Sequence, residues 1–293
     1  MNVGFIGLGR MGFGMASRIL SGGHDLVVYD AVPAQSEKLG SGGARVASSV
    51  ADVCAGRDVV VTMLVEDITV AEVALGRGGL CESLPSGAIH LVMGTHGVAT
   101  VRTLEARHAE ARQILVAAPV LGRPDLAAAG QLGIVAAGPD EAVRRCEPLL
   151  SCMGRRTFLA GSKPESATAI KLANNAVLGC AMVAMAEAFS LVRKYGVVPQ
   201  VFQDVMTEGL FSAPAYKVYG QKMVDQSYDD VGSPIHVGLK DASLIAAAAD
   251  LARVPMPSHN VYHDRLIGAV AHGDGNRDQA VLAREQARAS GLD

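Results

Sequence analysis

The chain opens with Asn2-Val-Gly-Phe-Ile-Gly7-Leu-Gly9-Arg-Met-Gly12, a short apolar run that leads into three closely spaced glycines. Met15, Ala16, Ile19 and Leu20 then recur at helical spacing. The order is therefore a strand, a glycine turn and a helix. This order is typical of the start of a doubly wound α/β domain, so the stretch predicts the fold class of the N-terminal half.

The glycine turn also predicts a binding site for the pyrophosphate of a dinucleotide. Gly7 permits a tight turn, Gly9 lets the phosphates approach the backbone, and Gly12 lets the helix pack on the strand. The N–H groups at the start of the helix then face the anion. We assign the whole turn to the cofactor site, namely Gly7, Leu8, Gly9, Arg10, Met11 and Gly12.

A second strand, 26–29, ends in Asp30, where this kind of fold places an acid that reads the ribose. An Asp accepts hydrogen bonds from the 2′-hydroxyl of NAD and repels the 2′-phosphate of NADP. We therefore expect NAD as the favoured cofactor, with NADP as the alternative. A second interpretation is that Asp30 only caps the turn before Pro33.

Strand and helix signals alternate as far as residue 160. We expect strands at 44–47, 58–64, 88–93, 114–117 and 132–137, with helices near 48–54, 98–111 and 141–153. The run 58–64 is almost wholly apolar, which is typical of a parallel strand buried on both faces. Ligands of such sheets bind at the carboxyl ends of the strands. These ends carry Leu64, Val65, Thr95, Leu121, Gly122 and Arg123.

Beyond residue 161 the strand signal disappears. An apolar segment at 165–195 predicts one long helix, which begins near Pro164 and ends before Gly196. Shorter helices are expected at 199–206, 214–223, 239–252, 258–272 and 279–289. The chain thus divides into a Rossmann-type domain at 1–160, with a doubly wound and mostly parallel sheet, and an all-α domain at 161–293, joined by the long interdomain helix.

Three polar side chains interrupt the apolar segment. The spacing of Lys171, Asn174 and Asn175 puts an ammonium and two amides on one helical face. A lysine buried among apolar side chains needs compensating hydrogen bonds, and its desolvation lowers its pKa. The pattern predicts a catalytic Lys held in place by an Asn. The alternative is that this face meets solvent or a subunit boundary, where Lys171 only extends its amine to water.

The composition narrows the class of protein. The chain has 293 residues, 49% hydrophobic content and a net charge of −3, so it buries a sizeable core and lacks the basic footprint of a nucleic-acid-binding protein. Five cysteines without a paired spacing are typical of a reducing compartment. No segment reads as a bilayer span or signal peptide, so we expect a cytoplasmic protein without a membrane partner. The length of the apolar helix favours a homodimer or homotetramer.

His259 and His263 have the i, i+4 spacing of metal ligands on a helix, and Asp264 follows them. The Glu of a metalloprotease motif and other nearby ligands are missing from this stretch. We therefore predict a polar helix face and no metal.

Four segments resemble the β-hydroxyacid dehydrogenase family, and they occur in the family's order over essentially the whole chain. They are Gly7-Leu-Gly-Arg-Met-Gly-Phe-Gly-Met15, Ala118-Pro-Val120, Lys171-Leu-Ala-Asn-Asn175 and Leu239-Lys-Asp241. The resemblance implies hydride transfer between a nicotinamide and a short 3-hydroxy acid or its semialdehyde or keto acid. It implies that Lys171 is the general acid/base and that Asn175 orients the substrate. It also implies that Leu64, Val65, Thr95 and Lys240 contact the cofactor.

The chain departs from the family where the substrate binds. Residues 117–123 read Ala-Ala-Pro-Val-Leu-Gly-Arg, where the family usually has Asp-Ala-Pro-Val-Ser-Gly-Gly. Leu121 replaces a Ser that commonly touches substrate, and Arg123 is new. We expect Arg123 to bind the carboxylate of the substrate, and a solvent-facing loop Arg is the alternative. The predicted substrate site comprises Leu121, Gly122, Arg123, Asn174 and Asp241.

Two other classes of function stay open. An imine reductase uses the same hydride donor but commonly has another residue in place of the Lys. A non-catalytic dinucleotide sensor would match family members that have lost the Lys. The presence of Lys171 and Asn175 argues against both classes.

Overall fold

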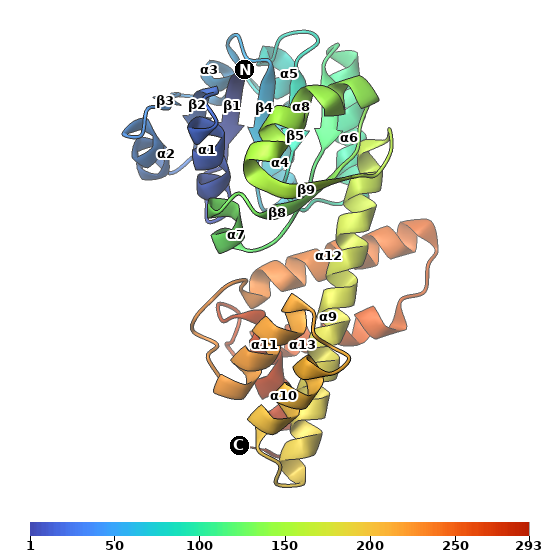
Figure 1. Ribbon diagram of the computed structural model, residues 1–293. Helices are drawn as coiled ribbons and strands as arrows, with labels where there is room; N and C mark the ends of the chain where they lie inside the picture. The colour runs from blue at the N-terminus through green and yellow to red at the C-terminus, as the bar shows by residue number, and fades with distance from the viewer. Residues whose placement is uncertain (293) are drawn as a thin grey trace. The chain divides into compact units, whose positions relative to one another are not determined.

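A computed structural model describes residues 1–292. Contacts between residues divide the chain into two compact units, Met1–Lys171 and a second unit that begins at Leu172. Helix α9, Pro164–Lys194, contributes its first turns to one unit and the rest to the other (Figure 1). The structure therefore has the long helix that the sequence predicts, with the division inside the helix at Lys171, whereas the sequence places the boundary near residue 160.

The first unit is built on a six-stranded parallel sheet with the order β3-β2-β1-β4-β5-β6. This confirms the predicted Rossmann-type sheet. The chain starts at β1 in the centre, builds outward to β3, and then crosses back to build β4, β5 and β6 on the other side. The crossing point between β1 and β4 is where such sheets bind ligands. The strands are β1 Asn2–Ile6, β2 Asp25–Tyr29, β3 Arg45–Val46, β4 Val59–Thr62, β5 Ile89–Val92 and β6 Ile114–Ala117.

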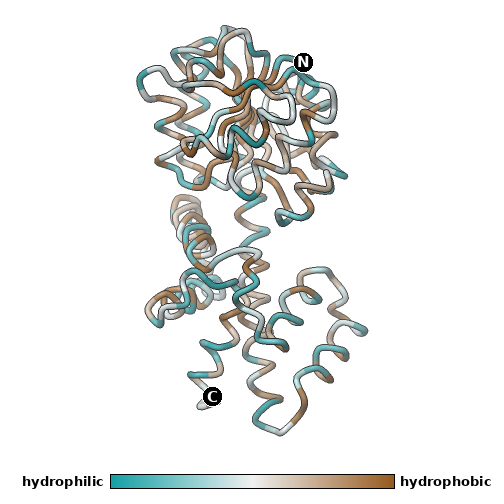
Figure 2. Tube along the Cα trace, turned by 90° about the vertical axis from the view of Figure 1, so that its left-hand side faces the viewer, coloured by the Kyte–Doolittle hydropathy of each residue, from teal (hydrophilic) through white to brown (hydrophobic). Residues whose placement is uncertain are grey.

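Neighbouring residues of each strand enter opposite apolar clusters, because side chains alternate along a strand. Val28 and Val61 pack with α1 and α8, while Val27 and Val60 pack with α3, α4 and α6. The central strands are accordingly brown in the hydropathy view of Figure 2. The helices of this unit are α1 Gly12–Ser21, α2 Pro33–Gly40, α3 Val50–Cys54, α4 Asp67–Leu75, α5 Leu80–Ser83, α6 Val98–Glu110, α7 Pro124–Ala128 and α8 Asp140–Met153.

A second, smaller sheet follows the main sheet in the sequence. Of its strands, the sequence predicts only the middle one. It consists of β7 Val120–Leu121, β8 Leu132–Ala136 and β9 Gly154–Leu159, where β7 is antiparallel and β9 parallel to β8. Strand β9 escaped prediction because Arg155 and Arg156 are exposed and break the apolar signal. The helices α2, α4, α5 and α7 also went unpredicted.

A chain of buried polar side chains links β4, β5 and α6. Thr62 Oγ1 lies 2.8 Å from His90 Nε2, His90 Nδ1 lies 2.8 Å from His108 Nε2, and His108 Nδ1 lies 2.7 Å from Gln113 Oε1. Because the Gln113 oxygen only accepts, His108 Nδ1 donates to it, and in neutral rings His108 Nε2 then accepts from His90 Nδ1. Burial keeps the pKa of His90 well below its ordinary value and lowers that of His108. These hydrogen-bonded side chains fix Thr62, the last residue of β4, in the sheet.

In the described chain, the second unit has helices and an isolated bridge between Pro234 and Asp278, which confirms the predicted helical domain. Gly179 lets α9 approach α13, since a Cβ there would lie 2.4 Å from the ring of Tyr262. The elements after α9 are α10 Pro199–Glu208, α11 Pro214–Asp225, α12 Ile235–Ala252, α13 Pro257–Ala271, η1 Gln279–Val281 and α14 Leu282–Ala289.

Helix α9 corrects one expectation from the sequence. By length and composition it is apolar enough to cross a membrane, with a mean hydropathy of 1.7 in its most apolar window. The sequence analysis expected no such segment. In that window 44% of the residues are buried inside the protein, and core helices of soluble proteins pass the same test.

One face of α9 in the second unit stays exposed. Val177, Ala184 and Leu191 follow one another at seven-residue steps, and Tyr195 comes directly after the end of the helix. The exposed fractions of Val177, Leu191 and Tyr195 are 71%, 60% and 82%. This apolar stripe has the spacing that one helix presents to another. This stripe would be a suitable contact surface between the subunits of the predicted homodimer or homotetramer. The oligomeric state stays a prediction.

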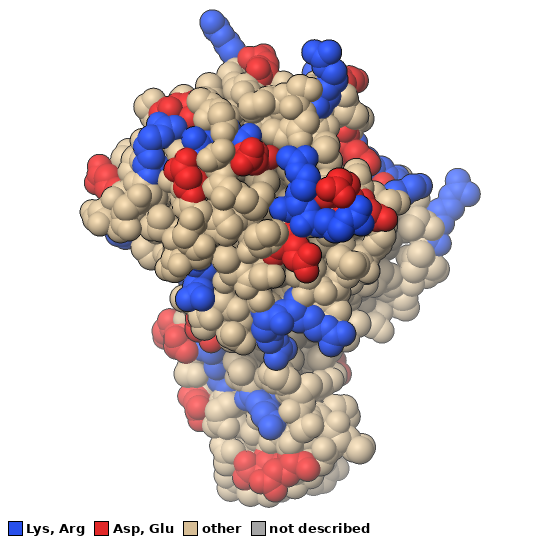
Figure 3. All heavy atoms as spheres, turned by 45° about the horizontal axis from the view of Figure 1, so that its top comes forward, with Lys and Arg blue, Asp and Glu red and all other residues tan. Residues whose placement is uncertain are grey.

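Acidic and basic side chains are interspersed on the face that Figure 3 shows. Proteins that bind nucleic acids instead gather Lys and Arg into a stripe or patch.

Candidate active site

The glycine turn joins β1 to α1 at the centre of the main sheet, as predicted. Gly7 has a φ of 95°, and a Cβ there would lie 2.5 Å from the carbonyl oxygen of Met63. A Cβ at Gly12 would lie 1.9 Å from the carbonyl oxygen of Gly7. At Gly9, in contrast, a Cβ would meet no described atom within 4 Å. The turn is therefore tight at both ends and open in the middle.

The open space at Gly9 and the start of α1 fit a dinucleotide phosphate. The N-cap residue of α1 is Met11, and no side chain of the described residues caps this end of the helix. The N–H of Phe13 donates to the carbonyl oxygen of Gly9 at 3.0 Å, so an anion would be bound by N–H groups that precede it, where the helix dipole also favours negative charge. Arg10 is exposed beside them, and Leu8 is buried below.

Asp30 lies at the carboxyl end of β2, where the sequence places it. One carboxylate oxygen accepts a hydrogen bond from the N–H of Leu8 at 2.6 Å, and the other accepts one from the N–H of Val32 at 2.8 Å. The carboxylate thus caps the turn after β2 and also fixes the glycine turn. A carboxylate accepts about four hydrogen bonds, so these two leave capacity for a ribose hydroxyl.

Asp67, which the sequence analysis did not select, joins the loop after β4 to the loop after β5. Its carboxylate accepts hydrogen bonds from His96 Nδ1 at 2.9 Å, from Thr100 Oγ1 at 2.6 Å, and from the N–H of Gly97 at 3.2 Å. Burial by itself would raise the pKa of this carboxyl, but the donors together hold the pKa of Asp67 below its ordinary value.

The bonds to Asp67 have a consequence for the cofactor crevice. Asp67 is the first residue of α4 and follows Leu64 and Val65, while Thr95 directly precedes His96. The carboxylate therefore fixes the spacing between two loops that the sequence assigns to the cofactor. Asp67 has no signal in the sequence, because its partners lie about 30 positions away and no fixed spacing marks them.

The predicted substrate loop follows β7. Gly122 has a φ of 147°. Arg123 follows it as the N-cap residue of α7. The Arg123 side chain is 29% exposed, and its Nε lies 4.0 Å from Asp125 Oδ1. Its Nη1 is buried and has no hydrogen-bond partner among the described residues. A buried N–H without an acceptor is unfavourable, so this atom is suited to bind an oxyanion.

Helix α9 carries the polar side chains that the sequence predicts. Lys171 is half-buried and Asn174 is exposed. The first turns of α9 keep an outward face, on which Ala169 and Ile170 are also exposed. Lysine buries its stem and leaves its amine near water in such places.

In the second unit, Asp241 brings two predicted residues together. Its Oδ2 accepts a hydrogen bond from Asn175 Nδ2 at 2.8 Å, and its Oδ1 lies 2.7 Å from Lys240 Nζ. The Lys240 and Asp241 side chains are only 13% and 15% exposed. The ion pair is therefore partly desolvated, and it holds the Asn175 amide in one orientation.

The two histidines at metal-ligand spacing have separate partners. His259 is buried with its Nε2 2.9 Å from the carbonyl oxygen of Ala242, and His263 Nε2 lies 3.4 Å from Ser243 Oγ. Among residues 1–292, no group of three or more His, Cys, Asp or Glu side chains is placed to hold a metal.

The parallel sheet, the open glycine turn and the acid at the end of β2 define a dinucleotide-binding protein. A family model described as the NAD binding domain of 6-phosphogluconate dehydrogenase matches residues 2–161. A second model, described as NAD-binding of NADP-dependent 3-hydroxyisobutyrate dehydrogenase, matches residues 166–285. The chain belongs to the β-hydroxyacid dehydrogenase family, whose members are NAD(P)-dependent oxidoreductases that act on CH–OH groups. This confirms the resemblance found in the sequence.

Known proteins match over nearly the whole chain. An uncharacterized oxidoreductase of Bacillus subtilis, YfjR, is 35% identical over 97% of this chain and 99% of its own. The NAD-dependent L-serine dehydrogenase of Pseudomonas aeruginosa is 34% identical over 96% of both. The crystal structure of 3-hydroxyisobutyrate dehydrogenase from Salmonella typhimurium superposes with a TM-score of 0.86 at 25% identity, covering 96% of this chain and 98% of that one.

Two alanine substitutions in the glycine turn should separate folding from binding. In Gly12→Ala the new methyl meets a backbone oxygen, so the free energy of unfolding in urea should fall by more than about 2 kcal/mol. In Gly9→Ala the methyl enters open space, so the free energy of unfolding should change by less than about 1 kcal/mol. The KM for the dinucleotide should nevertheless rise at least about tenfold in Gly9→Ala. An unchanged KM in that variant would show that the phosphates do not bind over Gly9.

Proposed function

We propose that this enzyme transfers a hydride between NAD and a short 3-hydroxy acid, or its semialdehyde or keto acid, with Lys171 as the general acid/base. The observation that carries the proposal is the polar face of α9. Lys171 precedes Asn175 by one helical turn, and Asn175 is fixed by its hydrogen bond to Asp241. The family membership of the chain supports this reading.

Each of these side chains has a separate task in the proposed reaction. The bound nicotinamide supplies the hydride chemistry. In the oxidation direction, a neutral Lys171 amine accepts the proton of the substrate hydroxyl, and in the reduction direction its ammonium returns a proton to the carbonyl oxygen. Asn175 gives its Nδ2–H to Asp241, which directs its carbonyl oxygen for a second partner. This amide orients the substrate without adding charge.

Replacement of the lysine tests the proposal. Lys171→Ala should lower kcat by about 10²–10⁴-fold, because the hydroxyl proton then has no acceptor. Fluorescence titration should show unchanged NADH binding, which separates chemistry from cofactor affinity. Turnover is followed by NAD(P)H absorbance with a panel of 3-hydroxy acids, aldehydes and cyclic imines. Turnover near that of the wild type would refute the role of Lys171, and activity restricted to cyclic imines would instead favour an imine reductase.

Arg123 is our candidate for the carboxylate clamp of the substrate. It stands in the loop that carries a substrate-touching Ser in the family, and its buried Nη1 has no described acceptor. A guanidinium binds both oxygens of a carboxylate in a planar pair of hydrogen bonds. L-Serine, named for the Pseudomonas aeruginosa relative, is itself a 3-hydroxy acid with a carboxylate.

Removal of this guanidinium should weaken substrate binding. In Arg123→Ala the KM for the best 3-hydroxy acid should rise about 10- to 100-fold, as expected for a lost hydrogen bond to a charged group. The KM for the dinucleotide should stay unchanged. Arg155→Ala is the matched control, because Arg155 is an exposed arginine on β9. An unchanged substrate KM in Arg123→Ala would mean that the arginine serves the loop only.

The preference for NAD rests on Asp30. The descriptions of the matching family models and relatives include both NAD- and NADP-dependent proteins. The proposed preference for NAD therefore depends on this acid. It lies at the ribose end of β2 and repels a 2′-phosphate.

Asp30→Ala should shift this preference. The substitution also removes the bond to Leu8, which affects both dinucleotides, so the ratio of kcat/KM for NAD to kcat/KM for NADP is the quantity to measure. This ratio should exceed one in the wild type and fall at least about tenfold in the variant. A wild type that favours NADPH would contradict the preference.

A further inference from the structure

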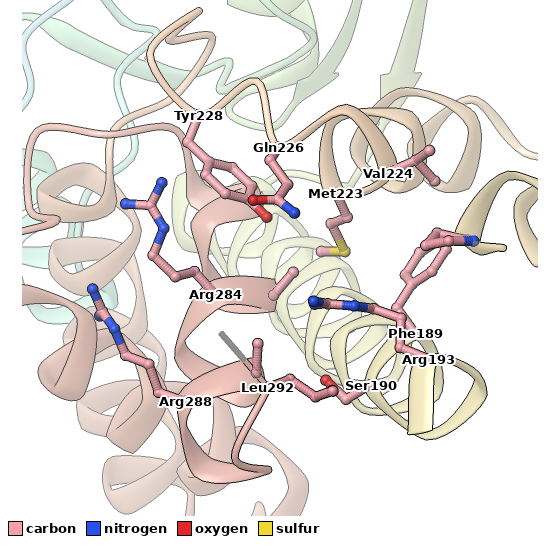
Figure 4. A pocket seen from close by; sticks show the side chains of 13 residues that line it. Phe189, Ser190, Arg193, Met223, Val224, Gln226, Tyr228, Arg284, Arg288 and Leu292 are labelled. Atoms are coloured by element: carbon pink, nitrogen blue, oxygen red, sulfur yellow. The ribbon is translucent and has the colours of Figure 1, made fainter. Parts of the chain in front are cut away.

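We propose that the helical unit holds a second binding site, for a small organic oxyanion, in a cavity formed by α9, α11 and α14 (Figure 4). The cavity has a volume of about 280 Å³. Its walls contain none of the residues that we assign to the cofactor or the substrate. The inference therefore does not depend on the proposed function.

The charge of the walls is the first argument. Arg193, Arg284 and Arg288 line the cavity, and its described walls contain no Asp or Glu. Arg193 comes from the last turn of α9, whereas the other two come from α14. In Figure 4, the guanidinium of Arg193 extends from α9 toward the side on which Gln226 and Tyr228 lie. Three cations around one small cavity favour an anionic ligand.

Two of these arginines are held in place by a buried carboxylate. Asp274, whose side chain is 6% exposed, accepts a hydrogen bond from Nη1 of Arg284 and one from Nη1 of Arg288, both at 3.1 Å. A guanidinium carries five N–H donors. In residues 1–292, Arg284 gives Asp274 only its Nη1, so its Nε and Nη2 remain for a ligand. A preorganised donor loses little entropy when it binds.

The positive charges of two arginines, Arg284 and Arg193, both act on the hydroxyl of Tyr228. Its ring is buried, and the guanidinium carbon of Arg284 lies 4.9 Å from the ring centroid. Burial raises the pKa of the Tyr228 hydroxyl; the positive charges of Arg284 and Arg193 lower it, and the negative charge of Asp274 acts with burial to raise it. Both guanidinium groups are therefore close enough to one phenol oxygen to act on its charge. An oxyanion near this hydroxyl would face two cations and one O–H donor.

The rest of the wall and the size of the cavity narrow the ligand further. Phe189, Met223 and Leu292 supply an apolar surface beside the arginines. Sites for drug-sized ligands occupy roughly 300–1,000 Å³, so a dinucleotide or a peptide would not fit here. The cavity suits a molecule with one carboxylate or phosphate group and a short apolar part.

A purely structural role is the competing explanation. Arg193 and Arg288 stand in the last turns of their helices, where basic side chains stabilise the helix dipole. Arg284 and Arg288 would then only balance Asp274 and Glu285. That role predicts no saturable binding of an anion at this place.

The test is calorimetric titration of the full-length protein with inorganic phosphate in one arm and butyrate in the other. Saturating NAD blocks the phosphate site of the glycine turn, and sodium chloride keeps the ionic strength constant. The wild type should bind at least one probe saturably, and the arm that binds identifies the head group. Arg193→Gln, which removes one cation, should weaken that binding at least tenfold, with an unchanged KM for the dinucleotide.

Two further variants complete the test. Val224→Phe keeps every charge but fills the cavity wall, so it should also weaken binding at least tenfold. Lys217→Gln removes one exposed cation outside the cavity and should bind like the wild type. The proposal is overturned if the wild type binds neither probe saturably, or if Arg193→Gln and Val224→Phe both bind as tightly as the wild type.

Discussion

The close approach of Gly12 to the carbonyl oxygen of Gly7 is the constraint on which the first unit depends. A side chain at Gly12 would place carbon 1.9 Å from that oxygen, so only glycine lets α1 begin so near the end of β1. This approach leaves the start of α1 uncapped by any described side chain and opens the space at Gly9. The phosphate site is therefore a consequence of backbone packing, and the same contact sets both the fold and the cofactor class.

Partly buried carboxylates then fix the parts that surround this turn. Asp30 ties the turn to β2, Asp67 ties the loop after β4 to the loop after β5, and Asp241 holds the Asn175 amide beside Lys240. In each case the carboxylate accepts a hydrogen bond from a segment other than its own. Such charge-assisted bonds are stronger than neutral ones, which suits groups that must hold loops at a defined spacing. Asp274 does the same for the arginines of the cavity in the helical unit.

Regular patterns in the sequence predicted elements whose stability is local. The apolar run at 58–64 predicted β4, and the proline and glycine that bracket α9 predicted its ends, because periodicity and breakers act within a few residues. Strand β9 was missed, since its pairing with β8 overrides a polar sequence. The half-buried position of Lys171 and the exposure of Asn174 were left to the structure, because composition reports how apolar a helix is but not which of its faces is covered.

The sequence alone determined the parallel sheet, the helical second half, the dinucleotide turn and the family. Each follows from motifs in which neighbouring residues act together. Only the tertiary structure identified Asp67 as the anchor of the crevice loops, paired Asn175 with Asp241, and gathered Arg193 and Arg284 around one cavity. These groups come from positions far apart in the chain, and a contact between distant residues is fixed by how the elements pack. No local pattern records it.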